Sequence, residues 1–254
     1  RVRECVQRSS IRLTIKYAVM KALRSIENIK SLSIIPFFVC PKAESICDDW
    51  IYDFQFWDKK FLESLTNKVE VDEVVEFIRS KAAGRRIVCA IGQQNKNKGF
   101  DEFVKLYLSS EGVQEKYLFV SGGKVSGIDE GLAEAFENSG GLLINKRISD
   151  SELVALYHAA DVVWACYLPE YDQSSGVLGR ALQYQKLVIV RRGSIAESLS
   201  LKSVGGVLSL PKKCYRDVFN GLEKAYVSDG SQNSPVNDAR TVSLNSLNIA
   251  LGED

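Results

Sequence analysis

One segment carries most of the information about how this chain is organised: residues 167–191, with the sequence YLPEYDQSSGVLGRALQYQKLVIVR. A polar turn over residues 169–176 separates a strand expected to end near Cys166 from a helix expected to begin near Ser175. The start of such a helix presents unpaired backbone N–H groups and the positive end of the helix dipole, which favour a bound anion such as phosphate. The apolar run Val188–Val190 is β-branched, as in a parallel strand buried on both faces. The segment is therefore a candidate nucleotide site.

The same alternation of short apolar runs and helical patterns extends to both sides of this segment. Strands are expected at Arg86–Ile91, Tyr117–Val120, Leu142–Asn145, Val162–Cys166, Leu187–Val190 and, more weakly, Gly206–Leu210. Helices are expected at Phe100–Ser109, Asp129–Asn138, Ser149–Ala160, Ile195–Leu199 and Tyr215–Tyr226. Strands joined by helices of about ten residues form βαβ units, which predict an α/β fold with a Rossmann-like, doubly wound parallel sheet. Ligands of such sheets bind at the carboxyl ends of the strands.

This alternation also predicts how the chain divides. Residues 85–227 are expected to form one Rossmann-like domain. Residues 1–84 are too short and too poor in βαβ pattern for a complete partner domain, so they are interpreted as the remnant of one, followed by a linker. Residues 228–254 form the tail, with a Ser-, Asp- and Asn-rich loop to residue 240 and a short, frayed helix beyond it.

The N-terminal region begins with a basic helical pattern at residues 9–29. Its apolar side chains share one face: Ile11, Ile15, Ala18, Val19, Ala22 and Ile26. Residues 1–30 hold eight Lys or Arg and two Glu, so the rest of the chain carries a net −5. Two interpretations stay open: a surface helix of a globular domain, or a helix that lies on an anionic membrane.

The rest of this region shows weaker signals. Residues Ser33–Val39 are expected to be a strand or extended segment with a break at Pro36. Residues 40–57 are irregular and aromatic-rich, and their rings either line a cleft or pack under a linker. A helix is expected over Asp72–Ala83, with Gly84 at the C-cap position.

The composition excludes several classes of protein. A chain of 254 residues with 45% hydrophobic and 26% charged residues is typical of soluble globular proteins, and a net charge of +1 argues against nucleic acid as a partner. No stretch holds the roughly 18 apolar residues of a membrane span, and no signal peptide opens the chain. The first residue is Arg1 rather than Met, which leaves open that the sequence is a fragment. The six cysteines lack zinc or redox spacing and are expected to be reduced thiols in a cytoplasmic protein.

Three loops follow the expected strands, at residues 92–99, 121–127 and 170–176. A lysine in the first loop can meet a phosphate charge, although a solvated polar loop explains it equally well. The glycines of the second loop are more simply explained by a tight turn, and the serines of the third by an ordinary helix N-cap. The single histidine, His158, is not placed near these loops, so it is a poor candidate for a general base. No cluster of His, Cys and carboxylates indicates a metal site.

Taken in order, these segments resemble the C-terminal, donor-binding domain of GT-B glycosyltransferases. The similarity is to the large retaining, group 1-like set, which has a Gly-Arg…Lys-Gly loop and two spaced glutamates. Residues 92–100 have the spacing of that loop, and residues 118–122 resemble the second strand and its glycine turn. Residues 148–162 are similar to the stretch that ends in Ala-Asp-Val, and residues 175–182 to the phosphate-binding turn and helix. The resemblance covers about residues 85–225.

The sequence departs from the family pattern at three places. The arginine after the first glycine is Gln93, which removes one cation from the donor diphosphate. The two glutamates correspond to Asp172 and Arg180, so the carboxylate that holds the ribose hydroxyls in the family is missing. A guanidinium cannot accept hydrogen bonds from hydroxyls, although it can pair with a phosphate. The Gly-x-Pro after the helix is Gln185-Lys186-Leu187.

The resemblance implies a metal-independent transfer with a nucleotide-sugar as co-substrate and no cofactor. Lys98 would neutralise the donor diphosphate, the N–H groups of Gly176–Leu178 would bind its distal phosphate, and Asp172 would face the transferred sugar. The backbone near Arg147 and Ile148 would contact the base. Lys98 and Asp172 are therefore the catalytic candidates. The substrate-binding candidates are Gly92, Gln93, Lys98, Arg147, Ile148, Ser174, Ser175, Gly176, Val177, Leu178 and Arg180.

Two functions from different classes follow. The leading hypothesis is a glycosyltransferase of polysaccharide biosynthesis that moves a sugar from a nucleotide-sugar donor to a saccharide or a lipid-linked glycan. It would be cytoplasmic, with residues 9–29 as the candidate for peripheral membrane contact. The alternative is a non-catalytic GT-B-like binding or scaffold module in which Gln93 and Arg180 have dismantled the donor site. An unrelated dinucleotide enzyme is disfavoured, because no Gly-x-Gly-x-x-Gly follows the first strand.

Overall fold

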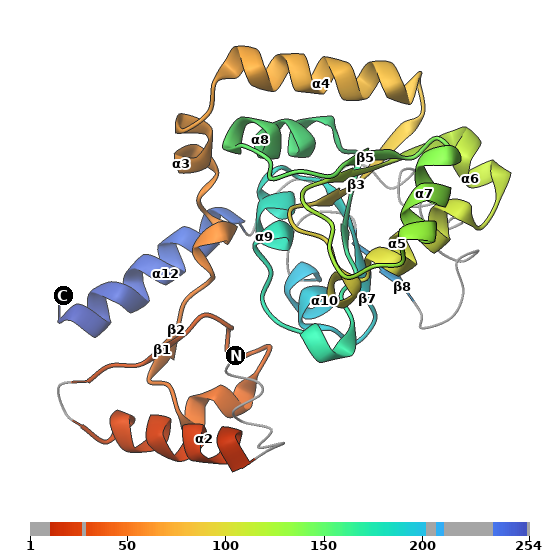
Figure 1. The fold of residues 1–254 in the computed structure, drawn as a ribbon. Helices are drawn as coiled ribbons and strands as arrows, with labels where there is room; N and C mark the ends of the chain where they lie inside the picture. Colours follow the sequence, from red (N-terminus) through yellow and green to blue (C-terminus); the bar gives the residue numbers. More distant parts are fainter. Residues whose placement is uncertain (1–10, 27–28, 202–206, 211–235, 253–254) are drawn as a thin grey trace.

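The computed structural model describes residues 11–26, 29–201, 207–210 and 236–252. Its centre is a six-stranded sheet (Figure 1) with strands β3 (Arg86–Ile91), β4 (Tyr117–Gly122), β5 (Leu142–Ile144), β6 (Val162–Ala165), β7 (Leu187–Arg191) and β8 (Val207–Leu210). The strand order is β5-β4-β3-β6-β7-β8, and every pairing is parallel. The chain runs outward from β3 to β5 and then returns to the other side of β3, so the order reverses between β3 and β6. The predicted Rossmann-like, doubly wound parallel sheet is confirmed.

Helices cover both faces of this sheet. One face carries α5 (Phe100–Leu108), α6 (Glu111–Lys116) and α7 (Glu130–Asn138). The other carries α8 (Asp150–Ala159), α9 (Gly176–Gln183) and α10 (Ile195–Ser200), with α4 (Lys68–Ala82) packed on α8. The short helix α6 was not expected from the sequence. The expected helix at residues 215–226 lies outside the described residues.

Burial alternates along the central strands. In β3, Ile87, Cys89 and Ile91 belong to the core under α8 and α9, whereas Val88 and Ala90 belong to the core under α5. Strand β6 divides in the same way, with Val162 and Trp164 on the α5 side. Because both faces are buried, the strands are continuous apolar runs rather than alternating ones.

Local capping explains where two of the helices begin and end. Helix α8 begins with the predicted capping box, in which Ser149 Oγ accepts the N–H of Glu152 and the Glu152 carboxylate accepts the N–H of Ser149. Helix α4 starts earlier than expected, because Asn67 Oδ1 accepts the N–H of Val69 at 3.0 Å. It ends at Ala83, which adopts a left-handed conformation with φ 51°.

The N-terminal segment departs from the expected extended strand at residues 33–39. Only Ser33 of that range belongs to a strand, since β1 (Leu32–Ser33) pairs with β2 (Asp49–Trp50) over two residues each. The buried Ser33 hydroxyl accepts the N–H of Ile35 at 3.0 Å and donates to its carbonyl at 2.7 Å, which bends the chain. The expected irregular, aromatic stretch then contains two 3-10 helices, η1 (Pro41–Ser45) and η2 (Phe54–Phe56), and is followed by α3 (Lys59–Ser64).

Helix α2 (Ile11–Arg24) has two apolar faces. Leu13, Tyr17 and Met20 pack against the small core of Ile46 and Cys47. The face predicted from periodicity is instead exposed, with Ile11 82%, Ile15 60% and Val19 51% accessible. No helix among the described residues is both long and apolar enough to cross a bilayer.

The C-terminal tail differs from the prediction of a loop to residue 240 and a frayed helix. Helix α12 (Val236–Leu251) already begins inside the expected loop and lies against the N-terminal segment (Figure 1). The buried Ser243 hydroxyl accepts the N–H of Tyr52 at 3.0 Å. This tertiary contact holds a helix whose own sequence gives only a weak signal.

Candidate functional site

A cavity of about 330 Å³ lies at the carboxyl ends of β3 and β6, where the strand order reverses. This is the position at which doubly wound sheets bind ligands. Among the predicted site residues, its walls include Gly92, Lys98, Ile148, Ser174, Ser175, Gly176, Val177 and Arg180. Residues far apart in the sequence are therefore brought together as the loop spacing predicted, while their roles in binding stay predictions.

The loop after β3 fixes the position of Lys98. Asn95 Oδ1 accepts the Lys98 N–H at 3.1 Å at the start of the 3-10 helix η3 (Lys96–Lys98). Gly99 ends this turn with φ 70°, and a Cβ there would lie 2.1 Å from the carbonyl oxygen of Cys166. Only glycine permits the loop to pack so closely on the end of β6.

The ammonium group of Lys98 has no ion-pair partner in the part of the chain that the structure describes. Burial lowers the pKa of Lys98, because the cavity wall removes water from the charged form. A partly buried, unpaired cation of this kind is stabilised by any anion that enters the cavity.

The turn before α9 supplies backbone donors to the same cavity. Ser175 caps the helix, and its hydroxyl accepts the Leu178 N–H at 3.4 Å and lies 2.7 Å from the Tyr167 hydroxyl. The Leu178 amide thus already has a weak acceptor, and its side chain is fully buried. Gly176 and Val177 have no acceptor for their N–H groups within the described residues. Two of the three predicted phosphate-binding amides are therefore free.

Sequence reasoning missed three tyrosines in the wall of the cavity: Tyr157, Tyr167 and Tyr171. Burial raises the pKa of Tyr167 to about 12, so its hydroxyl stays protonated at neutral pH. The Tyr157 hydroxyl donates to the Val177 carbonyl at 3.4 Å. Tyr167 lies two residues beyond the end of β6 at Ala165, and this position at the carboxyl end of a strand was the sequence signal that could have identified it.

Asp172, predicted to face the transferred sugar, is not part of the cavity wall. Its Oδ1 accepts the N–H of Ile195 at 2.9 Å, and its Oδ2 pairs with the Arg191 guanidinium at 2.9 Å. The carboxylate holds the start of α10 to the end of β7. Gln93 and Arg147 are exposed and also lie outside the wall.

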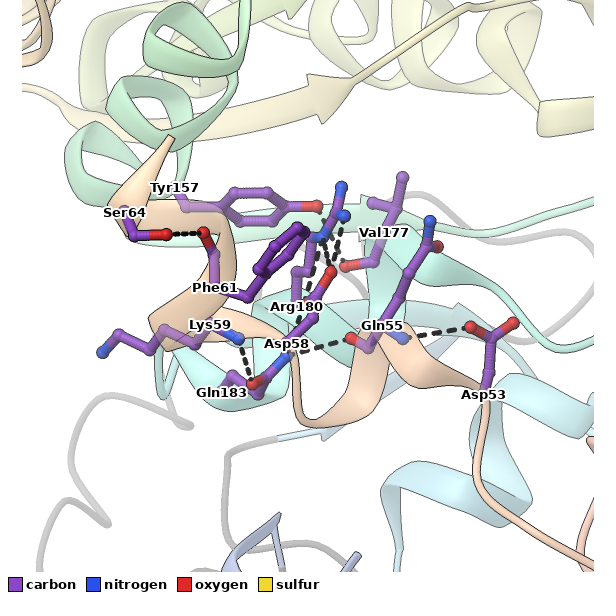
Figure 2. A network of polar contacts seen from close by, with 10 residues as sticks. All are labelled: Asp53, Gln55, Asp58, Lys59, Phe61, Ser64, Tyr157, Val177, Arg180 and Gln183. Atoms are coloured by element: carbon purple, nitrogen blue, oxygen red, sulfur yellow. Dashed lines mark hydrogen bonds and ion pairs between the residues drawn. The ribbon is translucent and has the colours of Figure 1, made fainter. Parts of the chain in front are cut away.

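Arg180 reaches the cavity but its charge is already engaged. Its guanidinium donates twice to Asp58 Oδ2, at 2.6 Å from Nη2 and 3.1 Å from Nε (Figure 2). The Asp58 side chain is 1% exposed, and its other oxygen accepts from Gln183 Nε2 at 3.1 Å. The sequence predicted a guanidinium available for a phosphate; the structure shows one paired with a buried carboxylate.

The remaining candidates agree with their simpler interpretations. Gly123 adopts φ 140° and a Cβ there would lie 2.1 Å from the Gly92 carbonyl oxygen, so the glycine turn allows two loops to touch. His158 is exposed on α8, with its ring 5.2 Å from that of Tyr184, and is not part of the cavity wall. Within the described residues no group of three His, Cys, Asp or Glu side chains is placed to hold a metal ion.

No protein-family model matches the sequence, and a search of curated proteins finds no match. Solved structures do match. The crystal structure of WaaG, a glycosyltransferase involved in lipopolysaccharide biosynthesis, aligns with a TM-score of 0.56 at 17% identity over 93% of this chain and 64% of that one. An α,α-trehalose-phosphate synthase (UDP-forming) from Burkholderia xenovorans aligns with a TM-score of 0.53 at 16% identity over 81% of this chain.

The chain spans about half the length of the trehalose-phosphate synthases it matches, 50% in the Burkholderia xenovorans structure. At these identities the likeness concerns the fold. The sheet order, the site of the cavity and both alignments agree on it. The resemblance predicted from the loops is confirmed at that level: the described sheet has the Rossmann-like fold of one domain of the GT-B glycosyltransferases.

Proposed function

We propose that this chain binds the diphosphate of a nucleotide-sugar and belongs to a glycosyltransferase that moves the sugar to a saccharide or a lipid-linked glycan. One observation carries the proposal: the ammonium of Lys98 and the N–H groups of Gly176 and Val177, which have no partner within the described residues, belong to the wall of the same cavity. A cation and a helix start are complementary to a pyrophosphate. Ile148 and Leu153 give the cavity an apolar part that suits a base.

The chemistry needs stabilisation of a leaving group. The bond between the anomeric carbon and the diphosphate oxygen breaks, and the nucleoside diphosphate leaves with the electron pair. The acceptor hydroxyl forms the new bond to the anomeric carbon and gives its proton to an oxygen of the departing diphosphate. Lys98 and the α9 amides stabilise the negative charge that develops on the diphosphate. Asp172 has no part in this step as proposed here, because Arg191 and Ile195 hold its carboxylate.

Isothermal titration with UDP-, GDP- and ADP-sugars tests the proposal. UDP-sugars come first, because the Burkholderia synthases of the same fold are UDP-forming. Lys98→Ala should weaken binding by about tenfold to a hundredfold, the range of a hydrogen bond to a charged group. Lys96→Ala is the matched control, since Lys96 is exposed on the same loop and is not part of the cavity wall. Equal losses in the two variants, or no binding by the unmodified chain, would contradict the proposal.

A second function has its own support. Arg180 is neutralised by Asp58, Asp172 is bound to Arg191, and Gln93 is exposed. Three positions that serve the donor in the resembling family are thus lost to it, as a non-catalytic binding module would show. In that case a nucleotide-sugar binds weakly or not at all, and the chain's partner binding is unchanged by Lys98→Ala. Sugar transfer assayed beside the titration separates the two functions.

We also propose that helix α2 lies on an anionic membrane surface. Its exposed apolar residues Ile11, Ile15 and Val19 lie at successive helical turns. The helix has no acidic residue and contains four cations: Arg12, Lys16, Lys21 and Arg24, the last of which pairs with Asp48. An apolar stripe among cations is complementary to acidic headgroups above acyl chains.

Co-sedimentation with vesicles tests this docking. Binding is expected to vesicles that contain an anionic phospholipid and not to vesicles of neutral phosphatidylcholine alone. The charge reversals Arg12→Glu and Lys16→Glu should abolish it, whereas Lys60→Glu, exposed on α3, should leave it intact. Binding that ignores lipid charge would remove the proposal.

A further inference from the structure

Gln55 lies in the wall of the cavity although it comes from the N-terminal segment, 121 positions before Gly176. Its side chain extends toward the start of α9 (Figure 2). A Cβ built on Gly176 would lie 1.1 Å from Gln55 Oε1, so the carboxamide rests directly on the first residue of α9. Gly176 and Val177, whose N–H groups have no acceptor within the described residues, line the cavity at the same place.

The main chain of Gln55 is held firmly in this place. Its N–H donates to Asp53 Oδ1 at 3.1 Å, and its carbonyl accepts from Gln183 Nε2 at 3.0 Å. Helix α9 allows the main chain of Gln55 to pack this closely because Gly179 also lacks a side chain. A Cβ there would lie 2.5 Å from the Gln55 carbonyl oxygen. Nearby, the Asp58–Arg180 ion pair ties the same segment to α9.

The carboxamide itself has no hydrogen-bond partner within the described residues. It is nonetheless half-buried beside the cavity. A glutamine side chain carries two N–H donors and one carbonyl acceptor, so a ligand in the cavity can form hydrogen bonds with it. Which of its two ends is oxygen is not fixed by the packing, so either end can be turned to the cavity.

We propose that Gln55 contacts the donor directly, with its Nε2–H groups donating to an oxygen of the phosphate bound at the start of α9. The inference rests on the proposed function and assigns to the N-terminal segment a part of the donor site. The resembling family has an arginine at the position of Gln93, and Gln93 is exposed here. Gln55 would supply a phosphate contact in place of that arginine. Lys98 and Gln55 then hold the diphosphate from two sides.

Two substitutions separate this contact from other roles. Gln55→Ala should weaken donor binding about tenfold by removing one hydrogen bond to an anion. Gln55→Glu keeps the shape but places a carboxylate against the phosphate, so binding should be at least about tenfold weaker than in Gln55→Ala at neutral pH. The loss should diminish as the pH falls and the new carboxyl protonates.

The control is Gln185→Glu, which makes the same chemical change on an exposed residue outside the cavity wall. Thermal unfolding of each variant checks that the fold is retained. A role in packing alone, or a contact with a sugar hydroxyl that a carboxylate also accepts, predicts that Gln55→Glu binds like the unmodified chain. That result would overturn the inference.

Titration with inorganic pyrophosphate keeps this inference apart from the proposed function. If pyrophosphate binds, no nucleotide-sugar binds and Gln55→Glu abolishes the pyrophosphate binding, the proposed function fails and the phosphate contact stands. If nucleotide-sugars bind and Gln55→Glu has no effect, the contact fails and the proposed function stands. If neither ligand binds the unmodified chain, both are overturned.

Discussion

Two cationic side chains, Lys98 and Arg180, reach the candidate donor cavity, and they differ in whether a carboxylate already pairs with them. Lys98 has no carboxylate partner in the described part of the chain, and burial lowers its pKa. Arg180 donates three hydrogen bonds to Asp58, a carboxylate that is 1% exposed. Both residues were predicted to meet a phosphate. The structure leaves only Lys98 with a charge to offer.

The difference arises from a residue that no local pattern connects to the site. Asp58 precedes Arg180 by 122 positions and belongs to the N-terminal segment. An arginine in place of the family's second glutamate predicts a side chain that binds an anion instead of the ribose hydroxyls. The contact with Asp58 indicates instead that this position now ties the N-terminal segment to α9. Whether a charged side chain is free for a ligand therefore depends on the tertiary fold.

The largest effect is expected from breaking the Asp58–Arg180 pair. Asp58→Ala leaves the guanidinium in a largely buried place without its carboxylate, which costs about 3–5 kcal/mol of unfolding free energy. Denaturant titration measures this. Breaking the exposed Lys105–Glu102 pair with Lys105→Ala is the control and should cost less than about 1 kcal/mol. Equal losses of unfolding free energy in the two variants would show that the buried ion pair stabilises the chain no more than the exposed one does.

The pair also changes how the missing ribose contact can be restored. Arg180→Glu alone would set two carboxylates against each other in a buried place, and the chain would be destabilised before any donor is bound. Adding Asp58→Asn removes this repulsion. A test that restores the family pattern with Gln93→Arg and Arg180→Glu therefore needs this third change.

The unpaired cation predicts a dependence on pH. Burial holds the pKa of free Lys98 below its ordinary value, and a bound diphosphate raises it again. Donor binding should thus be strongest below the free pKa, then weaken by up to about tenfold per pH unit as the pH rises between the free and bound values. Titrations at rising pH measure it, and Lys98→Arg should flatten the profile because a guanidinium stays charged. Tyr167 does not interfere, since burial raises its pKa to about 12.

The sequence was sufficient for the parts of the fold that local physics controls. The apolar runs of β3 and β7 and the capping box at Ser149 matched the structure, because burial on both faces and capping leave direct marks on composition. The loop spacing also placed Lys98 and Gly176 in one cavity. In a parallel sheet the loops that follow the strands lie at the same edge, so the order of strands and loops along the chain is enough to predict that these two residues meet.

Other features depend on contacts between distant residues and left no local mark. Gln55 and Asp58 reach the site only because η2 docks on the glycine face of α9. From the sequence, the Asp172 carboxylate was expected to face the transferred sugar. In the structure it accepts the N–H of Ile195 at the start of α10 and pairs with Arg191. Helix α12 is held by its contact with Tyr52, and its Ser- and Asn-containing sequence predicted a frayed end.

Two glycines of α9 test how the N-terminal segment is attached. A Cβ at Gly179 would meet main-chain and ring atoms, the Gln55 carbonyl oxygen at 2.5 Å and Phe56 Cδ2 at 2.6 Å. Gly179→Ala should therefore destabilise the chain by about 1–3 kcal/mol. Gly176→Ala meets only the end of the flexible Gln55 side chain, so its effect on stability should be smaller, while donor binding weakens as Gln55 is displaced. If Gly176→Ala were the more destabilising of the two, the docking described here would be wrong.

The smallest expected effect on stability concerns the residues at which the turn of Lys98 and the helix of Arg180 end. The turn with Lys98 ends at Gly99 with φ 70°, whereas the helix with Arg180 is followed by Gln185 with φ 54°. A left-handed conformation costs a residue with a Cβ about 1–2 kcal/mol, and glycine avoids this but loses more freedom on folding. Gln185→Gly should therefore stabilise the chain by only about 0.5–1 kcal/mol, measured by denaturant titration. Gly99→Ala should act in the opposite direction and more strongly, because its Cβ would lie 2.1 Å from the Cys166 carbonyl oxygen. A neutral or destabilising Gln185→Gly would mean that the Gln185 side chain contributes a contact that outweighs its backbone strain.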